Sequence, residues 1–489
     1  MTTADAPASR PAIKSLTSMM FSFSPERQEL FARLSGDYNP IHMDRVACRR
    51  LIHGQPVVHG VHGLLWALNG WLETEVNRIR VTRLSVKFRS PCFVGKVPQV
   101  AVTSQGDRAA KLAVMVDGSK MLVATVEWQG GTTADLPIPA SSTEEVVCRR
   151  PSLSEMRQLS GEIPLVLDRP LTKVLFPNVE RCLAAEQVAV LLATSRLVGM
   201  EVPGRNSIFG GMELEALENS QQPLLTYRVK GYDARLSLVT IRVDGPGLSG
   251  FVSALLRPEP KRQRTPDGLR KLVPAALFRG ERALVIGGSR GLGEVAAKVL
   301  ALGGADVRLT YHQGTTDAEN VVSEIVANGG VAECFAYDAL GAPAVLTSQV
   351  RDWEPTTLCY FATPYIEPGS KGRFASEKFA KFCEYYVRGF HDAFQAVRGP
   401  RLRSILYPSS SLLDENPSIF AEYIAAKAAG EALCRVLERT NPGVRICTPR
   451  LGRLATDQTA SILDEEVPDA AETIANVLLE MRASRRSAG

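Results

Sequence analysis

The apolar and polar positions of the first part of the chain follow two different periods. From Arg83 to Arg89 apolar and polar side chains alternate, as in a strand with one buried face. Similar strand-like stretches cover 98–104, 111–116 and 121–128, whereas the apolar run 64–75 predicts a buried helix. The pattern therefore predicts one helix wrapped by four strands.

A second stretch of the chain repeats this order. A long apolar helix is predicted over 184–198, and strands are predicted over 224–229, 236–243 and 250–256. The residues between the two stretches, 130–145, are rich in turn formers and indicate a linker. We expect two similar halves that share one continuous sheet and bury both central helices.

The last part of the chain changes character after a connection rich in proline and charge. A short apolar strand at 283–286 is followed by a glycine-rich turn, a helix that ends near Leu302 and another strand at 306–311. Strands that alternate with helices predict a doubly wound parallel sheet. The domains expected are a flexible tail over 1–18, a first half over 19–135, a second half over 146–258, a linker over 259–278 and a third domain over 279–489.

Composition narrows the class of protein and the compartment. A chain of 489 residues should form more than one domain. Its net charge of +5 is small, and its basic residues are dispersed apart from the cluster 261–264, so no nucleic acid partner is expected. No apolar run is long enough to cross a membrane, and the nine cysteines occur singly, which indicates reduced thiols, a cytoplasmic protein and no metal site.

The first candidate for catalysis is a carboxylate and an imidazole five residues apart, Asp37 and His42. Asn39 can cap a helix that begins at Pro40, which places His42 in the first helical turn. The positive end of the helix dipole should keep that imidazole neutral, so the two side chains can form an acid/base pair. The alternative is simple turn chemistry, because Asp-x-Asn-Pro is also a common turn.

The surrounding residues favour catalysis through a family resemblance. One stretch closely resembles the signature of MaoC-like, (R)-specific enoyl-thioester hydratases, which have the hot-dog fold. It reads Phe31-Ala32-x-Leu34-Ser35-Gly36-Asp37-x-Asn39-Pro40-x-His42 and is followed by Val58-His59-Gly60. The resemblance implies that Asp37 and His42 activate water for addition to a trans-2-enoyl thioester. It also implies that the Gly60 N–H stabilises the enolate oxygen. The second half should be non-catalytic, because no histidine occurs between His62 and His312.

The glycine-rich turn between the strand and the helix at 283–302 predicts a nucleotide site. Glycines allow the backbone to approach a pyrophosphate at the helix N-terminus. The second strand ends in 310–313 without a carboxylate for the ribose 2′-hydroxyl, and Arg290 could meet a 2′-phosphate. We therefore expect NADP(H) rather than NAD(H). The loop residues expected at the cofactor are Gly287, Ser289, Arg290, Gly291, Leu292 and Gly293.

Three features together resemble the short-chain dehydrogenase/reductase family. They are this loop, the pair in Tyr423-x-x-x-Lys427 and the serines 409–411. Tyr423 and Lys427 share one helix face, and the ammonium should lower the tyrosine pKa so that the phenol can exchange a proton. The resemblance implies that Ser410, or its competitor Ser411, holds the substrate oxygen. It also implies that Asp338 contacts adenine and that Thr456 closes over the nicotinamide.

Two departures from the family pattern bear on catalysis in the third domain. Tyr360-Phe361-Ala362-Thr363 replaces the usual Asn-Asn-Ala-Gly, and the helix around 385–394 offers no asparagine for a proton relay. A domain that binds the nucleotide without turnover therefore remains an alternative.

Together the patterns predict an α+β double hot-dog unit followed by an α/β Rossmann-type, doubly wound parallel sheet. The expected function is interconversion of enoyl, (R)-3-hydroxyacyl and 3-ketoacyl thioesters of CoA or an acyl carrier protein by a homodimer. The alternatives are a hydratase with a degenerate reductase-like domain, and a non-catalytic acyl-thioester binding module in a synthase assembly.

Overall fold

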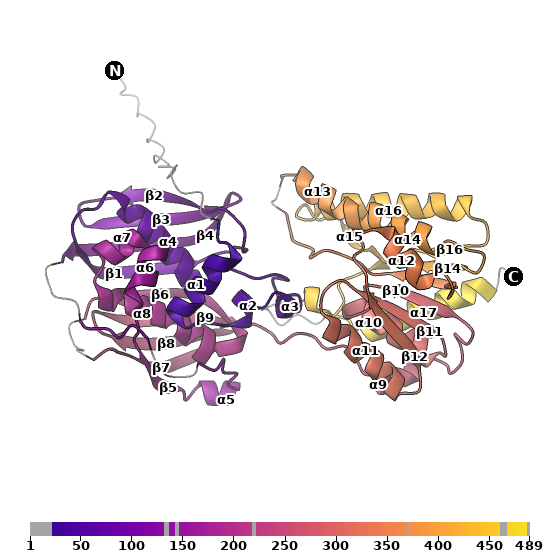
Figure 1. The fold of residues 1–489 in the computed structure, drawn as a ribbon, viewed down its shortest axis with the longest axis horizontal. Coiled ribbons are helices and arrows are strands. Elements are labelled where there is room, and N and C mark those ends of the chain that lie inside the picture. The colour runs from indigo at the N-terminus through magenta and orange to yellow at the C-terminus, as the bar shows by residue number, and fades with distance from the viewer. Residues whose placement is uncertain are drawn as a thin grey trace, which may run out of the picture. The chain divides into compact units, whose positions relative to one another are not determined.

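The chain forms two compact units in the computed structural model, the first ending at Glu259 and the second beginning at Pro260 (Figure 1). The structure describes residues 22–131, 136–141, 146–217, 222–369, 372–459 and 467–486. The tail expected over 1–18 lies outside the described residues, as do parts of the expected linker 130–145.

In the described part of the N-terminal unit, nine antiparallel strands form one continuous sheet in the order β2-β3-β4-β1-β6-β9-β8-β7-β5. The two halves meet where β1 pairs with β6, from Arg83 opposite Glu215 to Lys87 opposite Gly211. The order β1-β4-β3-β2 on one side matches β6-β9-β8-β7 on the other, where β5 is an additional edge strand, so the sheet has an approximate twofold symmetry. The strands are β1 (Ile79–Phe88), β2 (Gln99–Gln105), β3 (Ala109–Val116), β4 (Ser119–Gly130), β5 (Ser160–Pro164), β6 (Ser207–Glu215), β7 (Leu224–Asp233), β8 (Leu238–Gly245) and β9 (Leu248–Leu256).

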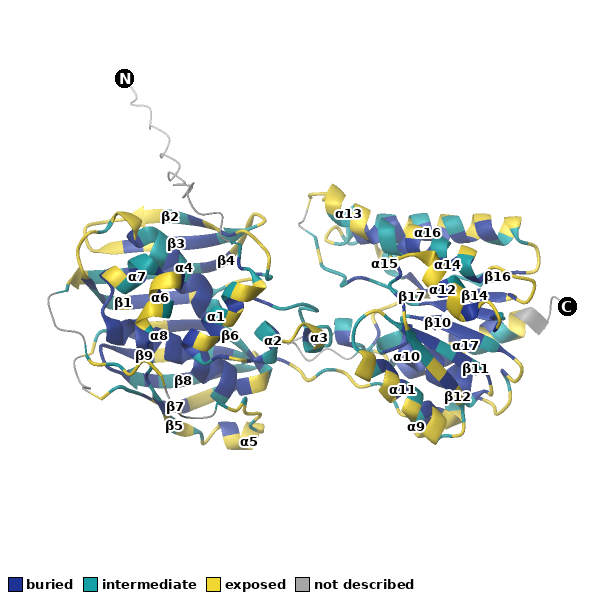
Figure 2. Ribbon diagram, in the orientation of Figure 1, coloured by how far each residue is buried: buried dark blue, intermediate teal, exposed yellow. Residues whose placement is uncertain are grey.

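Two central helices, α4 and α8, pack against this sheet, one from each half (Figure 2). A helix that is apolar on most of its faces is stable only when it is buried, and every residue of α8 is buried. Gln187 of α8 also joins the halves, because its Nε2 donates to Val81 O at 2.8 Å and its Oε1 accepts from Val81 N at 2.9 Å. The helical segments are α1 (Pro25–Ser35), α2 (Pro40–Met43), α3 (Arg45–Cys48), α4 (Gly60–Trp71), η1 (Leu72–Thr74), α5 (Leu153–Met156), α6 (Arg169–Leu175), α7 (Pro177–Cys182), α8 (Ala185–Arg196), η2 (Leu197–Glu201) and η3 (Gly204–Asn206).

The central helices and the shared sheet agree with the sequence prediction, but the strand β6 is an addition to it. Its sequence contains Gly210 and Gly211, which usually indicate a turn. In the structure these glycines lie at an irregularity in the pairing of β6 with β9. A Cβ on Gly211 would meet Val86 O at 2.5 Å, so the close approach of β1 requires glycine there.

In the described part of the C-terminal unit, six parallel strands form a sheet in the order β12-β11-β10-β13-β14-β16, which is the doubly wound order of dinucleotide-binding folds. The predicted parallel sheet is therefore present. The remaining pair, β15 with β17, is also parallel. The strands are β10 (Arg282–Ile286), β11 (Asp306–Tyr311), β12 (Val331–Ala336), β13 (Thr357–Tyr360), β14 (Ser404–Leu406), β15 (Ser409–Ser410), β16 (Arg445–Cys447) and β17 (Arg450–Leu451).

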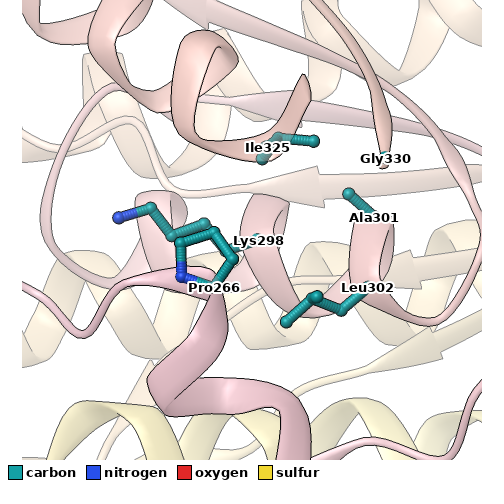
Figure 3. Close-up of a pocket in the computed structure, with 6 residues that line it drawn as sticks. All are labelled: Pro266, Lys298, Ala301, Leu302, Ile325 and Gly330. Carbon is teal, nitrogen blue, oxygen red and sulfur yellow. The ribbon is translucent and has the colours of Figure 1, made fainter. Parts of the chain in front are cut away.

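Helices cover both faces of this sheet (Figure 1). The helical segments are α9 (Pro266–Leu269), η4 (Arg270–Leu272), α10 (Gly291–Leu302), α11 (Thr315–Ala327), α12 (Pro343–Val350), α13 (Ser376–Cys383), η5 (Glu384–Gly389), α14 (Phe390–Val397), α15 (Leu412–Glu415), α16 (Ala421–Thr440), η6 (Asp457–Thr459) and α17 (Ala470–Arg486). The connection before β10 takes part in this packing. Its Leu269 is fully buried, and its Pro266 lines a small hollow with Lys298 of α10 and Ile325 of α11 (Figure 3).

Candidate active sites

The loop that carries Asp37 and His42 is fixed at both ends by local chemistry. Helix α1 ends at Gly36, whose φ of 74° is the left-handed conformation that favours glycine. Asn39 then caps α2, because its side-chain oxygen accepts from Ile41 N at 3.1 Å, and Pro40 occupies the first helical position. The predicted cap is present, and it holds Asp37 just outside the helix.

The Asp37 carboxylate is buried at the junction between the halves, with 2% of the residue exposed. Its Oδ2 accepts from Ser195 Oγ of α8 at 2.7 Å, and its Oδ1 accepts from Asn39 N at 3.2 Å. A Cβ on Gly199 of η2 would collide with this carboxylate. Ser195 and Gly199 were not among the residues expected from the sequence, and their spacing of four within a buried apolar helix is the signal that could have indicated them.

Asn39 joins the same loop to the second half. Its Nδ2 donates to Gly199 O at 2.8 Å and to Gly204 O at 3.0 Å. Both acceptors lie in the turn that follows α8. Because its oxygen caps α2 while its nitrogen binds that turn, Asn39 sets the position of the loop relative to the second half.

The His42 ring faces the same junction. Its Nδ1 lies 2.7 Å from Val57 O, and a carbonyl can only accept, so in the neutral ring Nδ1 carries the proton and Nε2 is the acceptor. Ring nitrogens of His42 and His59 and a carboxylate oxygen of Asp37 all lie within 4.8 Å of one another. The structure therefore brings the two predicted residues Asp37 and His42 together.

Burial shifts the pKa values of the two groups toward each other. Burial raises the pKa of the Asp37 carboxyl, although His42, Ser195 and the Asn39 N–H act in the opposite direction. Burial also lowers the pKa of His42, although Asp37 opposes it. Burial, rather than the helix dipole invoked from the sequence, is thus the main cause of the neutral imidazole. A carboxyl with a raised pKa beside an imidazole whose Nε2 is an acceptor can work as an acid next to a base.

The neighbouring imidazole, His59, has a structural environment. Its Nε2 lies 2.9 Å from the Asp37 backbone oxygen and its Nδ1 lies 2.8 Å from Gln28 Oε1. The Gln28 amide continues to His62 Nδ1 at 3.0 Å. Protein groups occupy both nitrogens of His59. The cluster of Asp37, His42 and His59 therefore does not offer three free ligand atoms to a metal ion.

Gly60 begins the central helix α4 beside this pair. The N–H groups of a first helical turn lack intrahelical partners, so the Gly60 N–H is a donor directed out of the helix end. A Cβ on this glycine would touch the Phe88 ring at 3.0 Å. The absence of a side chain keeps the N–H accessible at a crowded position.

A cavity of about 420 Å³ lies along the same junction. Apolar side chains of α1 and α8 form much of its wall, and charged groups stand among them. Its lining includes Leu34, Gly36, Tyr38, Ile163, Leu192 and Arg196. The cavity wall therefore includes Gly36 and Tyr38, the two chain neighbours of Asp37.

In the C-terminal unit, the glycine-rich turn joins β10 to α10 as predicted. Gly287 and Gly291 have φ values of 77° and 57°. A Cβ on Gly293 would collide with Gly287 O, so the turn closes tightly against the first turn of α10. The backbone N–H groups of that turn fit the charge of a dinucleotide pyrophosphate.

The other residues expected at the cofactor surround this turn. Thr456 lies against Gly291, at 3.8 Å from the position of an added Cβ. Arg290 Nη1 is 3.8 Å from Asp457 Oδ2, beside Thr456 in the chain. Asp338 Oδ2 is 3.8 Å from His312 Nδ1, at the ends of neighbouring strands. Ser289 is buried within the turn, and Leu292 packs on the core.

Tyr423, Lys427 and Ser410 meet at the start of α16. A hydrogen bond joins Tyr423 to Ser410, while Ser409 Oγ donates instead to Glu431 Oε1 at 2.6 Å. Lys427 Nζ donates to Pro408 O at 2.7 Å. The structure thus places Ser410 beside the tyrosine, whereas its competitor Ser411 directly precedes α15 and its N–H donates to Leu451 O at 2.9 Å.

The tyrosine pKa moves in the direction opposite to the expectation. Burial raises the pKa of Tyr423, and the hydrogen bond with Ser410 opposes that rise. Burial also lowers the pKa of Lys427 to about 7, and its ammonium is directed to a carbonyl and to aromatic rings. A lysine that is partly neutral near pH 7 gives the phenolate less support than a full charge would.

Aromatic residues occupy the region where the family pattern would place asparagines. Lys427 Nζ lies 4.1 Å from the centre of the Tyr386 ring, which belongs to the π-helical turn η5. The Tyr386 hydroxyl is 2.6 Å from Thr363 Oγ1, just beyond the end of β13. A Thr363–Tyr386 hydroxyl pair thus lies beside the Tyr423 and Lys427 side chains.

Comparison with known proteins agrees with both parts of the chain. Residues 6–125 match the family model described as a MaoC like domain. A 3-oxoacyl-[acyl-carrier-protein] reductase of Synechocystis sp. is 31% identical over 200 residues, covering 38% of this chain and 78% of that protein. This chain belongs to the short-chain dehydrogenase/reductase family. Tyr423, Lys427 and the glycine-rich turn place the reductase-family part in the C-terminal unit.

Two further similarities concern the same family. A 2,3-dihydro-2,3-dihydroxybenzoate dehydrogenase of Bacillus subtilis is 25% identical over 198 residues, covering 39% of this chain and 76% of that protein. A short chain dehydrogenase of Burkholderia cenocepacia, solved in complex with NADP, is 26% identical, covers 42% of this chain and 91% of that one, and has a TM-score of 0.38. Among the described residues, no helix is both long and apolar enough to cross a membrane.

Proposed function

We propose that this chain is a bifunctional acyl-thioester enzyme. Its N-terminal unit interconverts trans-2-enoyl and (R)-3-hydroxyacyl thioesters, and its C-terminal unit interconverts 3-hydroxyacyl and 3-ketoacyl thioesters with NADP(H). The observation that carries the proposal is the close Asp37–His42 pair at the junction of the halves, where burial raises the pKa of the carboxyl and lowers that of the imidazole. Similarity to a MaoC like domain and to a 3-oxoacyl-[acyl-carrier-protein] reductase supports an acyl thioester as the shared substrate.

Hydration uses the two neutral groups in opposite roles. The water oxygen bonds to the β-carbon while one water proton passes to Nε2 of His42. The electrons of the carbon–carbon double bond move toward the thioester oxygen, and the protonated Asp37 supplies a proton to the α-carbon. The proton left on His42 then returns to Asp37, and the pair is reset over a separation of at most 4.8 Å.

The charge that develops on the thioester oxygen needs a donor that is already in place. The Gly60 N–H at the start of α4 supplies it, and the positive end of the helix dipole adds to the stabilisation. The Phe88 ring packs beside this glycine.

In the C-terminal unit, a bound nicotinamide cofactor supplies or accepts hydride at the carbon that carries the substrate oxygen. The Tyr423 hydroxyl donates a proton to that oxygen during ketoreduction, and Ser410 holds the oxygen through a hydrogen bond. Lys427 lies one helical turn further along α16 and stabilises the phenolate once the proton has left.

The preference for NADP(H) rests on charge at the adenosine end of the nucleotide site. The second strand ends without a carboxylate, and the Arg290 guanidinium, which lies 3.8 Å from Asp457 Oδ2, can bind a 2′-phosphate. Dissociation constants for NADPH and NADH test this point, and tighter binding of NADH would refute it.

A specific observation favours one alternative, a C-terminal unit that binds the nucleotide without turnover. Tyr360 and Phe361 stand where the family pattern has two asparagines, the helix around Tyr386 offers no asparagine, and the Tyr386 ring lies over Lys427 Nζ at 4.1 Å. Under this alternative Tyr423→Phe has no effect on any NADPH-dependent conversion, whereas a working reductase loses that conversion.

One incubation separates these possibilities. The full chain is mixed with crotonyl and acetoacetyl thioesters, with and without NADPH, and products are resolved by mass and by the stereochemistry at the 3-position. The proposal expects (R)-3-hydroxybutyryl thioester from both substrates, and from acetoacetyl thioester only with NADPH. Absence of the hydroxy product from crotonyl thioester would refute the N-terminal assignment.

A further inference from the structure

Arg257 is a buried cation to which no carboxylate of the described residues forms a hydrogen bond. It directly follows β9, and only 3% of the residue is exposed. Its backbone N–H donates to Asn206 O at 2.8 Å, and its Nη2 donates to Arg205 O. Within the described part of the chain, Nε and Nη1 have no hydrogen-bond partner. Burial of a guanidinium with unused N–H groups is costly, which indicates a ligand for them.

The nearby carboxylate does not fill this need. Glu259 is bound instead by Arg150, with Arg150 Nη2 at 2.7 Å from its Oε2, and by the Asn206 amide. Burial lowers the pKa of Arg257 only to about 10, so the group is charged at neutral pH.

The position of Arg257 ties it to the Asp37–His42 site. The turn η3 that anchors the guanidinium also anchors the catalytic loop, because Gly204 O accepts from Asn39 Nδ2. The titratable groups within electrostatic range come from several segments around the guanidinium, and its charge lowers the pKa of each of them. They are Cys48, His42, His53 and Cys148.

We propose that Arg257 binds a carboxylate carried by the acyl group of the substrate, so that the N-terminal unit acts on enoyl thioesters that bear a second anionic group. This inference rests on the proposed hydratase function of Asp37 and His42. Guanidinium N–H groups are strong, charge-assisted donors to carboxylate oxygens, and a ligand carboxylate would satisfy the unused nitrogens.

A phosphate is the other anion that could reach a guanidinium, but its position in the substrate disfavours it. In a CoA or carrier-protein thioester, the phosphate lies at the far end of the pantetheine arm from the reacting carbons. Arg257 is buried beside the loop that holds the reacting groups. The acyl end of the substrate, rather than its carrier end, is therefore the source of the anion.

The test compares two five-carbon substrates, trans-2-pentenoyl-CoA and glutaconyl-CoA, in which a carboxylate replaces the terminal methyl group. The ratio of their kcat/KM values for hydration is measured with the wild-type chain, Arg257→Met and Arg257→Lys. The control is Arg149→Met, an arginine of the same region whose side chain is 57% exposed and paired with Glu201. Both substrates are also supplied as pantetheine thioesters, which lack phosphate.

The wild type should prefer glutaconyl-CoA at least about tenfold, and Arg257→Met should lower that preference on the order of 30-fold while Arg149→Met leaves it unchanged. Arg257→Lys should retain part of it. A wild-type preference for pentenoyl-CoA, or an equal ratio in Arg257→Met, would overturn the inference even if hydration itself is efficient. An effect of Arg257 that vanishes with the pantetheine thioesters would identify phosphate as the anion and overturn it as well.

Thermal unfolding of each variant shows whether a changed ratio reflects a folded protein. If Arg257→Met does not fold, the wild-type ratio and Arg257→Lys still decide the matter. Failure of the wild type to hydrate either substrate, or crotonyl-CoA, refutes the proposed hydratase function itself, which is a different result from loss of selectivity alone.

Discussion

Two loops cross the junction between the halves of the N-terminal unit, in opposite directions. From the first half, Asp37 reaches the central helix α8 of the second half and accepts from Ser195 at 2.7 Å. From the second half, Asn178 of α7 reaches the central helix α4 of the first half. Its N–H donates to Asn69 Oδ1 at 2.8 Å and its Nδ2 donates to Asn69 O at 2.9 Å. The doubled sheet thus offers two related junctions.

The difference between the junctions is the ability to move a proton. At the first, a carboxyl with a raised pKa lies near an imidazole with a lowered pKa. At the second, an amide binds an amide, and neither has a titratable proton near neutral pH. Similar packing supports both loops, so the chemistry is set by a few side chains rather than by the fold.

Asp37→Asn should have the largest effect on the chemistry of the first junction. The amide cannot supply a proton, so hydration of crotonyl-CoA should slow about 10³-fold, measured by loss of the enoyl absorbance. Because the pKa of Asp37 is raised in the folded state, the free energy of unfolding of the wild type falls as the pH rises through that pKa. The variant has no carboxyl at this position and lacks this loss. At neutral pH the free energy of unfolding of the variant should therefore be no lower than that of the wild type. The difference between the two should grow as the pH rises through the pKa of Asp37 in the folded wild type. Ketoreduction of acetoacetyl thioester is the internal control, and a fully active variant would contradict the assignment.

Gly199→Ala tests whether the second half positions the carboxylate. The added Cβ collides with Asp37, and displacement of a catalytic group by about 1 Å can cost roughly 100-fold in rate. The matched control is Gly231→Ala in β7, where a Cβ meets no atom within 4 Å. Equal hydration rates in the two variants would show that the contact between the halves does not orient Asp37.

Ser195→Ala should have a smaller effect, because it removes one hydrogen bond and leaves the carboxyl in place. A loss of about tenfold in kcat corresponds to ~1.4 kcal/mol, within the usual range for a single hydrogen bond. Ser195 lowers the pKa of Asp37, so its removal should move the limb of the pH–rate profile that reports this carboxyl to higher pH. A shift to lower pH would contradict the hydrogen bond as the cause. Ser195→Thr, which keeps the hydroxyl, should keep the profile of the wild type.

The features that the sequence predicted and those that it missed differ in how far apart in the chain their contact partners lie. Alternation over Arg83 to Arg89 predicted β1, and the glycines from Gly287 to Gly293 predicted the turn before α10, because both patterns are local. Ser195 contacts Asp37 from 158 positions away, and no local pattern carries that information. The glycine pair in β6 likewise resembles a turn in the sequence, and only its pairing with the neighbouring strand β1 shows that it belongs to a strand.

The expectation of a lowered Tyr423 pKa failed for a related reason. The tyrosine–lysine spacing predicts a shared helix face correctly, but not the direction of the Tyr423 pKa. That direction depends on burial, since only 7% of Tyr423 is exposed, and on the aromatic rings that surround Lys427. Spacing along a helix reports neighbours on that helix, whereas desolvation depends on every element packed against it.

Asn178→Ala should have the smallest effect on rate and thereby define the second junction as structural. The variant loses the Nδ2 hydrogen bond to Asn69 O, so the free energy of unfolding should fall by about 1 kcal/mol. Its hydration rate should stay within about twofold of the wild type, because no proton passes through this amide pair. Chemical denaturation and initial rates on the same preparation measure both quantities. A rate loss as large as that of Ser195→Ala, without a matching loss of stability, would mean that the two junctions work together in catalysis and that the second half does more than support the first.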